Sequence, residues 1–128
     1  MVERVRDRDA MIRQMKPALQ VGRFAFTTVP DGEPADTRNA IATLREAEGL
    51  SLVLPADEVP GAPVMRQITL QVFSALDGVG LTAAVAAALA EGGIPANVVA
   101  GFHHDHVFVP EADADRAVGI LRGLAAST

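Results

Sequence analysis

The chain has 128 residues, enough for one compact domain or for two very small ones that share a core. Hydrophobic residues make up 49% and charged residues 21%, which is typical of a folded globular protein and argues against long disordered segments. The net charge of −5, the scattered basic residues and the lack of Trp and Tyr argue against binding to DNA or RNA.

No cysteine is present, which excludes disulfides, a thiolate metal site and a cysteine nucleophile. The charged N-terminus lacks the apolar core of a signal peptide. The most apolar run, Leu81 to Ala90, is too short to span a bilayer. We therefore expect a cytoplasmic protein without membrane contact.

The first elements in chain order are a helix and a strand. Met11, Ile12 and Met15 recur at helical spacing and predict a helix over residues 7–15, which Pro17 ends. Strand-forming residues predict a strand over 23–29, closed by Pro30-Asp31-Gly32.

A polar loop over 30–38 precedes a predicted hairpin with strands at 40–46 and 50–54. Gly49 at its connection can take positive φ. Residues 41–44 would also suit a helical turn, since Ala and Leu favour one. The proline-rich segment 55–63 is the best candidate for an internal boundary.

The second half alternates more clearly. Ile68, Leu70 and Val72 fall on one face of a predicted strand, while Thr69 and Gln71 fall on the other. The remaining expected elements are this strand at 66–73, a loop at 74–80, a helix at 81–91 ending at Gly92-Gly93, strands at 97–102 and 106–109, and a helix at 113–125.

These elements form a coarse repeat with βαββ-like halves at 1–62 and 63–128. The first half has no counterpart of the helix at 81–91, and the N-terminal helix is the candidate to cover its sheet. Two such halves with helices on one sheet face predict an α/β (α+β) fold. The expected form is a ferredoxin-like sandwich with a largely antiparallel sheet.

Four segments of the second half carry a family resemblance: Ile68-Thr69-Leu70, Val79 to Val85, Gly93 to Gly101 and His104 to Pro110. They resemble the ACT domains, which are regulatory modules of aspartate kinases and other enzymes of amino-acid metabolism. With the Glu48-Gly49-Leu50 turn, the chain is similar to small stand-alone bacterial ACT-domain proteins of unknown function. The resemblance covers residues 11–121 and implies an ACT-type fold, with any ligand held where two ACT units meet.

In ACT domains of the aspartate-kinase type, the glycine loop before the first helix and the start of the next strand contact an amino acid. Carried over by position, the resemblance implies a ligand site made of Asp77, Gly78, Val79, Gly80, Leu81, Thr82, Asn97 and Val98.

Physical chemistry gives this site independent support. The first N–H groups of a helix have no intrahelical partner and, with the helix dipole, favour a carboxylate. Gly78 and Gly80 allow a ligand to approach the backbone closely, and Asn97 offers both a donor and an acceptor to an amino acid. The purely structural alternative is that the glycines make a tight turn, Thr82 caps the helix and Asn97 caps a strand turn.

Residues 78–83 also fit G-x-G-x-x-A, the dinucleotide-binding fingerprint. However, the preceding strand alternates between polar and apolar residues, and Val98 and Val99 stand where an acidic residue would be expected. Dinucleotide binding is therefore disfavoured.

The segment His103-His104-Asp105-His106 is the most conspicuous chemical cluster. His104 and His106 fall on the same side of a strand and would suit a metal ion or a general base. No third ligand is visible nearby, and Asp105 also suits the turn between two strands. The role of this segment remains open at the level of sequence.

The function expected from these observations is a small-molecule-binding regulatory or sensor module, with an amino acid as ligand and no cofactor. It is not expected to be an enzyme. The alternative is an interaction or structural module without a ligand. Because lone ACT units pair and Leu81 to Ala90 is apolar nearly all round, we also expect a homodimer with that helix buried.

Overall fold

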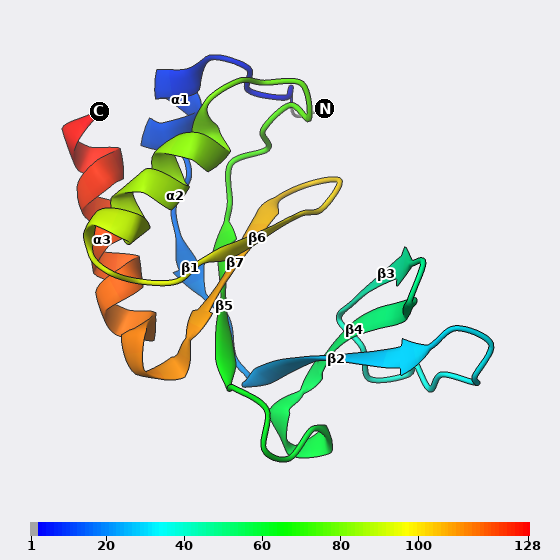
Figure 1. The fold of residues 1–128 in the computed structure, drawn as a ribbon. Helices are drawn as coiled ribbons and strands as arrows, with labels where there is room; N and C mark the ends of the chain where they lie inside the picture. The colour runs from blue at the N-terminus through cyan, green and yellow to red at the C-terminus, as the bar shows by residue number, and fades with distance from the viewer. Residues whose placement is uncertain (1–2) are drawn as a thin grey trace. The chain divides into compact units, whose positions relative to one another are not determined.

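A computed structural model describes residues 3–128. Figure 1 shows its elements: α1 (Arg8–Arg13), β1 (Ala18–Leu19), β2 (Phe24–Pro30), β3 (Ala42–Glu46), β4 (Gly49–Pro55), β5 (Met65–Leu70), α2 (Leu81–Glu91), β6 (Asn97–Ala100), β7 (Asp105–Pro110) and α3 (Ala114–Ser127). Short 3-10 turns follow β4 and β7, at Ala56–Glu58 and Glu111–Asp113. The chain packs as two units, the described part of Met1–Val21 with Arg66–Thr128, and Gly22–Met65.

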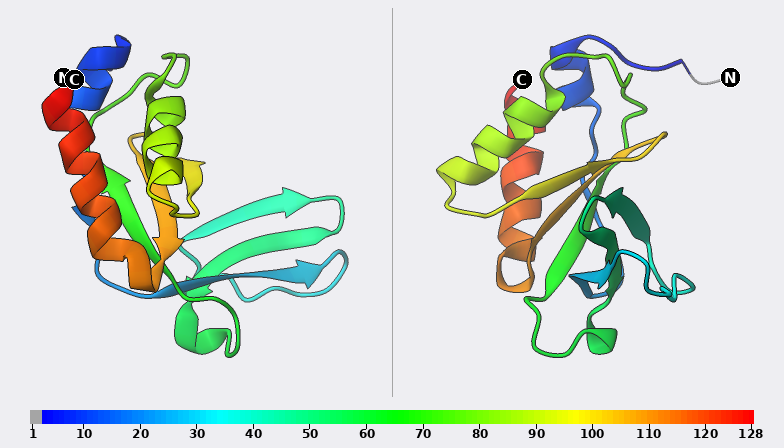
Figure 2. Two further views of the ribbon diagram at one scale, coloured as in Figure 1. Left: turned by 60° about the vertical axis from the view of Figure 1, so that its left-hand side comes forward. Right: turned by 45° about the vertical axis from the view of Figure 1, so that its right-hand side comes forward.

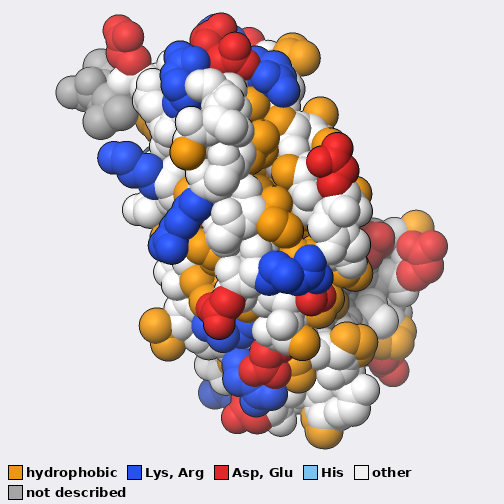
Figure 3. Space-filling model, turned by 90° about the vertical axis from the view of Figure 1, so that its left-hand side faces the viewer, with side chains coloured by type: hydrophobic (Ala, Val, Ile, Leu, Met, Phe, Trp, Pro, Cys, Tyr) orange, Lys and Arg blue, Asp and Glu red, His pale blue; other side chains and the backbone are white. Residues whose placement is uncertain are grey.

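The first unit is a sheet with helices on one face. Its strand order is β1, β5, β7, β6, with β1 antiparallel to β5 and β6 antiparallel to β7. Figure 2 shows α2 and α3 side by side against these strands. Figure 3 shows the helix-bearing side, where charged side chains of both signs surround hydrophobic ones.

The core of this unit lies between helices and sheet. It is formed by Met11, Ile12, Met15, Ile68, Leu70, Val72, Leu81, Val85, Leu89, Ile94, Val107, Val109, Ala114, Ala117, Val118 and Leu121. The alternation predicted for the strand after residue 66 is confirmed in the fold, since Ile68, Leu70 and Val72 all belong to this core. Removing such side chains from water is the main stabilising contribution to the unit.

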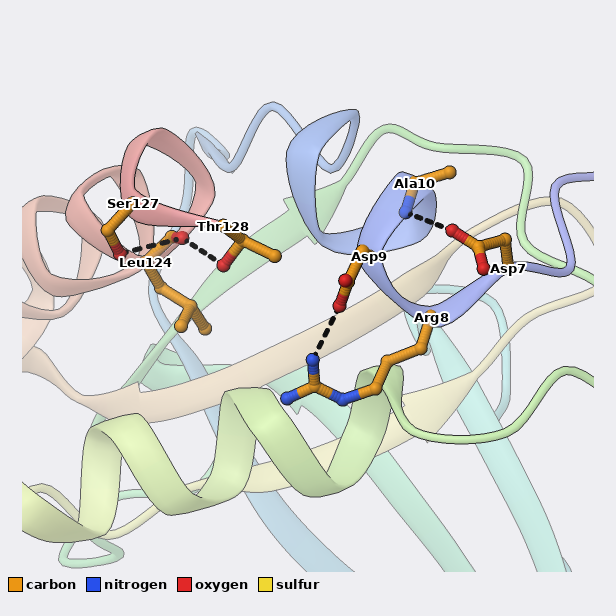
Figure 4. A network of polar contacts seen from close by, with 7 residues as sticks. All are labelled: Asp7, Arg8, Asp9, Ala10, Leu124, Ser127 and Thr128. Atoms are coloured by element: carbon orange, nitrogen blue, oxygen red, sulfur yellow. Dashed lines mark hydrogen bonds and ion pairs between the residues drawn. The ribbon is translucent and has the colours of Figure 1, made fainter.

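The N-terminal helix belongs to this unit as well. Three side chains, Met11 and Ile12 of α1 and Met15 just after its C-cap residue, are no more than 1% exposed. Helix α1 contacts both α2 and α3. The expectation that this helix covers the sheet of the first half is therefore wrong. Asp7 caps α1 by accepting a hydrogen bond from the Ala10 N–H, at 2.9 Å (Figure 4).

The second unit is a three-stranded antiparallel sheet in the order β3, β4, β2. Strand β2 pairs with β4 over its whole length, from Phe24 opposite Pro55 to Pro30 opposite Gly49. Gly49 has a φ of +155°, and a Cβ there would lie 2.1 Å from the Val29 carbonyl oxygen, so only glycine fits this hairpin.

The observed elements agree with the predicted ferredoxin-like α/β fold and its largely antiparallel sheet. Residues 41–44 fall in or beside strand β3 and not in a helical turn. Strand β5 ends at Leu70, three residues earlier than predicted, and the two-residue strand β1 was not predicted. The predicted boundary at residues 62/63 divides the sequence into two consecutive halves. Packing instead groups the described residues before Gly22 with Arg66–Thr128. None of the helices within residues 3–128 combines the length and apolar character needed to cross a bilayer.

Candidate ligand-binding site

The predicted glycine loop leads into the first turn of α2. Gly80 is the N-cap residue, with a φ of +113° and no side-chain cap, and its carbonyl accepts the first helical bond from the Ala84 N–H at 3.0 Å. The N–H groups of Leu81 and Thr82 therefore lack a partner within the helix. They carry the positive end of the helix dipole.

Both glycines also have a packing reason to be glycine. A Cβ on Gly78 would lie 3.1 Å from the sulfur of Met11 and 3.1 Å from the Ala75 carbonyl oxygen. A Cβ on Gly80 would lie 2.8 Å from Cγ of Arg8. The loop is thus packed against α1, so the glycines by themselves do not establish a ligand site.

A small cavity of about 140 Å³ opens in front of this turn. It is lined by Met11, Ser74, Ala75, Leu76, Gly78, Gly80, Leu81, Thr82, Ala100 and Asp105. Four of the predicted site residues, Gly78, Gly80, Leu81 and Thr82, are therefore brought together around one space. Apolar and polar groups share its wall, as in many small-molecule sites.

Asp105 supplies the negative charge of this cavity. Burial raises the pKa of its carboxyl, while the neighbouring His106, a hydrogen bond with Ser74 and His104 act in the opposite direction. The cavity is thus lined by a half-buried carboxylate and by the first turn of α2, whose first N–H groups have no partner within the helix. Such a pair of groups matches the two charges of a zwitterion.

The other predicted residues lie elsewhere. Asp77 is exposed and forms an ion pair with Arg6, and Val79 is 83% exposed. Neither lines the cavity.

Asn97 and Val98 are placed by the pairing of β6 with β7. Asn97 is opposite Phe108 and Val98 is opposite Val107, which lies in the helix-facing core. Because neighbouring residues of a strand point to opposite faces, Val98 faces the helices and Asn97 faces away from them. Asn97 is therefore on the sheet face opposite to the cavity.

Sequence reasoning treated Asp105 as a turn residue and so missed it as a site residue. The turn is instead made by Gly101 to His104, closed by a 2.9 Å hydrogen bond from the Gly101 N–H to the His104 carbonyl. Asp105 is the first residue of β7, two residues before Val107. That spacing puts its carboxylate on the helix-facing side, a signal that was available once the strand was assigned.

The histidines make different contacts. Nδ1 of His106 lies 3.1 Å from Nε2 of Gln67 and 3.0 Å from Oγ1 of Thr69. Burial lowers the pKa of the His106 imidazole, the nearby His104 lowers it further, and Asp105 opposes both. Nδ1 thus accepts the Gln67 amide hydrogen, which matches a neutral ring with its proton on Nε2.

His104 and His103 lie at the hairpin tip. Nδ1 of His104 is 3.3 Å from the carbonyl oxygen of Val72, and the ring of His103 packs near Phe73 and Phe102. Within residues 3–128, no group of three or more His, Cys, Asp or Glu side chains is arranged to hold a metal ion.

An antiparallel sheet with helices on one face is the ferredoxin-like type of α/β fold. Two family models of the ACT domain match the chain, one over residues 5–62 and the other over residues 64–123. The chain therefore belongs to the ACT-domain family. ACT domains commonly bind amino acids in regulatory roles.

Several solved structures resemble the chain. A Vibrio cholerae protein of unknown function, described as a possible transport protein, is 44% identical with a TM-score of 0.78; the match covers 88% of this chain and 91% of that one. An Agrobacterium tumefaciens protein is 21% identical with a TM-score of 0.71, covering 85% and 87%. The regulatory subunit of aspartate kinase from Thermus flavus is 11% identical with a TM-score of 0.59, covering 84% and 95%. The last two likenesses concern the fold alone. No protein of curated function matches the chain.

Proposed function

We propose that this protein is a regulatory module that binds an amino acid in the cavity between the first turn of α2 and Asp105. The observation that carries the proposal is the pairing, around about 140 Å³, of an uncapped helix start with a half-buried carboxylate. The ligand's carboxylate would accept hydrogen bonds from the N–H groups of Leu81 and Thr82. Its ammonium group would pair with Asp105.

The size of the cavity restricts the ligand. Sites for drug-sized molecules usually measure about 300–1,000 Å³, more than twice the space available here. The cavity therefore suits the head group of an amino acid, with any large side chain extending past Leu76 and Thr82 toward solvent. We expect the ligand to be bound and released unchanged, as in a regulatory module.

A thermal-shift screen against the twenty amino acids is the first test, followed by calorimetry with the best ligand. Asp105→Asn should weaken binding by about ten- to a hundredfold, because a hydrogen bond to a charged group is worth about 1.5–3 kcal/mol. Asp115→Asn, an exposed carboxylate on α3, is the matched control and should leave the affinity unchanged.

Asn97→Ala distinguishes this site from the one expected from sequence. Because Asn97 lies on the other face of the sheet, its replacement should not alter the affinity. A loss with Asn97→Ala and none with Asp105→Asn would move the site to that face. No binding of any amino acid at millimolar concentration would favour an interaction module instead.

We propose further that two copies of the chain pair. Only Leu81, Val85 and Leu89 of α2 are buried within the chain, and a row of small side chains, Ala83, Ala86, Ala87 and Ala90, remains exposed on its outer side. A second copy that covers this row would bury the helix all round. Light scattering that gives twice 13.4 kDa at tens of micromolar supports pairing, and a value of one chain mass contradicts it.

A further inference from the structure

A second groove, separate from the amino-acid cavity, lies between the end of α1 and the last turns of α3. Its volume is about 480 Å³, and it is lined by Arg13, Lys16, Pro17, Gln71, Arg122, Ala125 and Ala126. Three of these seven residues are cationic and none is acidic, in a chain whose net charge is −5. We propose that this groove is a binding site for a small polyanion, a metabolite that carries a phosphate or several carboxylates.

The three cations are not engaged elsewhere. Arg6, Arg8, Arg38 and Arg116 form ion pairs with Asp side chains. Among residues 3–128, in contrast, no side-chain hydrogen bond or ion pair is found for Arg13, Lys16 or Arg122. Three like charges that share a groove repel one another, and an anionic ligand removes that repulsion.

Backbone carbonyl groups beside the groove already accept hydrogen bonds from other donors. Gln71 donates its backbone N–H to the Met15 carbonyl at 2.5 Å and its side-chain amide to the Lys16 carbonyl at 2.8 Å. At the end of α3, the hydroxyls of Ser127 and Thr128 donate to the Leu124 carbonyl, as Figure 4 shows. Because these three carbonyls already have donors, they do not compete with a ligand for the cationic side chains.

Lys16 is held in an unusual conformation. Its φ of +42° is the only positive value of a residue other than glycine in the described part of the chain, and Pro17 follows it. Such a conformation persists only where its surroundings enforce it, and it is concentrated at functional sites. Here the bonds from Gln71 fix the backbone of Lys16 at the rim of the groove.

Lys16 and Gln71 also line a larger adjoining cavity of about 630 Å³, which has a different character. Its wall includes Glu3, Phe73, His103 and His104. An anion bound at the cationic groove could therefore extend its uncharged part over Phe73 and the imidazoles. Both volumes lie in the range of small-molecule sites.

Isothermal titration calorimetry at low salt, with pyrophosphate and with citrate as separate probes, tests the proposal. Saturable binding of pyrophosphate alone identifies a phosphate site, and binding of citrate alone identifies a polycarboxylate site. The double variant Lys16→Gly, Arg122→Gln should weaken the bound probe by at least about tenfold. Glycine accepts the positive φ of residue 16, so this variant keeps the backbone.

Arg38→Gln is the matched control, since Arg38 is an exposed arginine of the other unit. It should leave the affinity unchanged. The proposal is overturned if neither probe saturates by on the order of 10 mM, if the double variant binds as the parent does, or if the control loses as much. Amino-acid binding at the α2 cavity should be retained in the double variant, so the two proposals fail separately.

Discussion

Replacing Ile12 by alanine tests whether α1 is an integral part of the unit that contains Arg66–Thr128. Ile12 has an exposed fraction of 0% and lies in the core between α1, α2 and α3. The change removes three carbon atoms, worth about 2.4 kcal/mol of transfer free energy at about 0.8 kcal/mol each. The cavity left behind adds about 1 kcal/mol or more. The higher helix propensity of alanine returns about 0.5 kcal/mol. The expected loss in free energy of unfolding is therefore about 3 kcal/mol.

Urea unfolding followed by circular dichroism measures this loss. Arg13→Ala, at the exposed neighbouring position, is the control and should change stability by no more than about 0.5 kcal/mol. A loss below about 1 kcal/mol for Ile12→Ala would refute the reasoning. It would mean that α1 detaches easily and that the core of this unit does not depend on it.

Three further predictions concern glycines and ionisable groups. Gly119→Ala should raise the free energy of unfolding by about 0.5–1 kcal/mol, since Gly119 lies inside α3 with open space around it. Gly80→Ala should lower the free energy of unfolding by about 1–3 kcal/mol, because residue 80 has a φ of +113° and a new Cβ would meet the Arg8 side chain. Thermal unfolding of both variants checks the pair, and equal effects would contradict it. Burial lowers the pKa of the His106 imidazole, so the unfolded chain binds a proton there before the folded protein does as pH falls below 6.5, and the free energy of unfolding decreases. His106→Gln should show a smaller decrease in the free energy of unfolding between about pH 7 and 5. An unchanged pH dependence would assign the effect to another group. The side-chain hydrogen bonds from Arg38 lower the pKa of Asp36 to about 2, and an NMR titration of Arg38→Gln should return it toward 3.8; a value that stays low would point to a different cause.

The sequence was sufficient for the periodic elements. Helix α2 was predicted at its observed bounds because the apolar, alanine-rich run that begins at Leu81 stops at Gly92-Gly93, where a helix is expected to end. The alternation of Ile68, Leu70 and Val72 identified the inner face of β5 and its continuation. These patterns are local, and each is repeated over several residues, so the physical signal does not depend on the rest of the chain.

Part of the candidate site could be predicted for the same reason. A glycine loop that opens a helix is a local arrangement, and Gly78, Gly80, Leu81 and Thr82 do line one cavity. Asn97 was expected there because it begins the next strand. Its pairing with Phe108 places it on the opposite face. The sequence could not show this, because Val98 and Val99 are both apolar and the strand therefore lacks the alternation that identifies an inner face.

Only the tertiary structure decided what the helices cover and which charges share a space. The amphipathic pattern of Met11, Ile12 and Met15 requires a hydrophobic partner but does not name one, and packing places it against α2 and α3. Asp105 joins the α2 cavity, and Arg13 and Lys16 join Arg122, from positions far apart in the chain. A sequence determines periodicity and chain stiffness residue by residue. Contacts between distant segments depend on how all the apolar faces are buried together, and that is settled only when the whole core has formed.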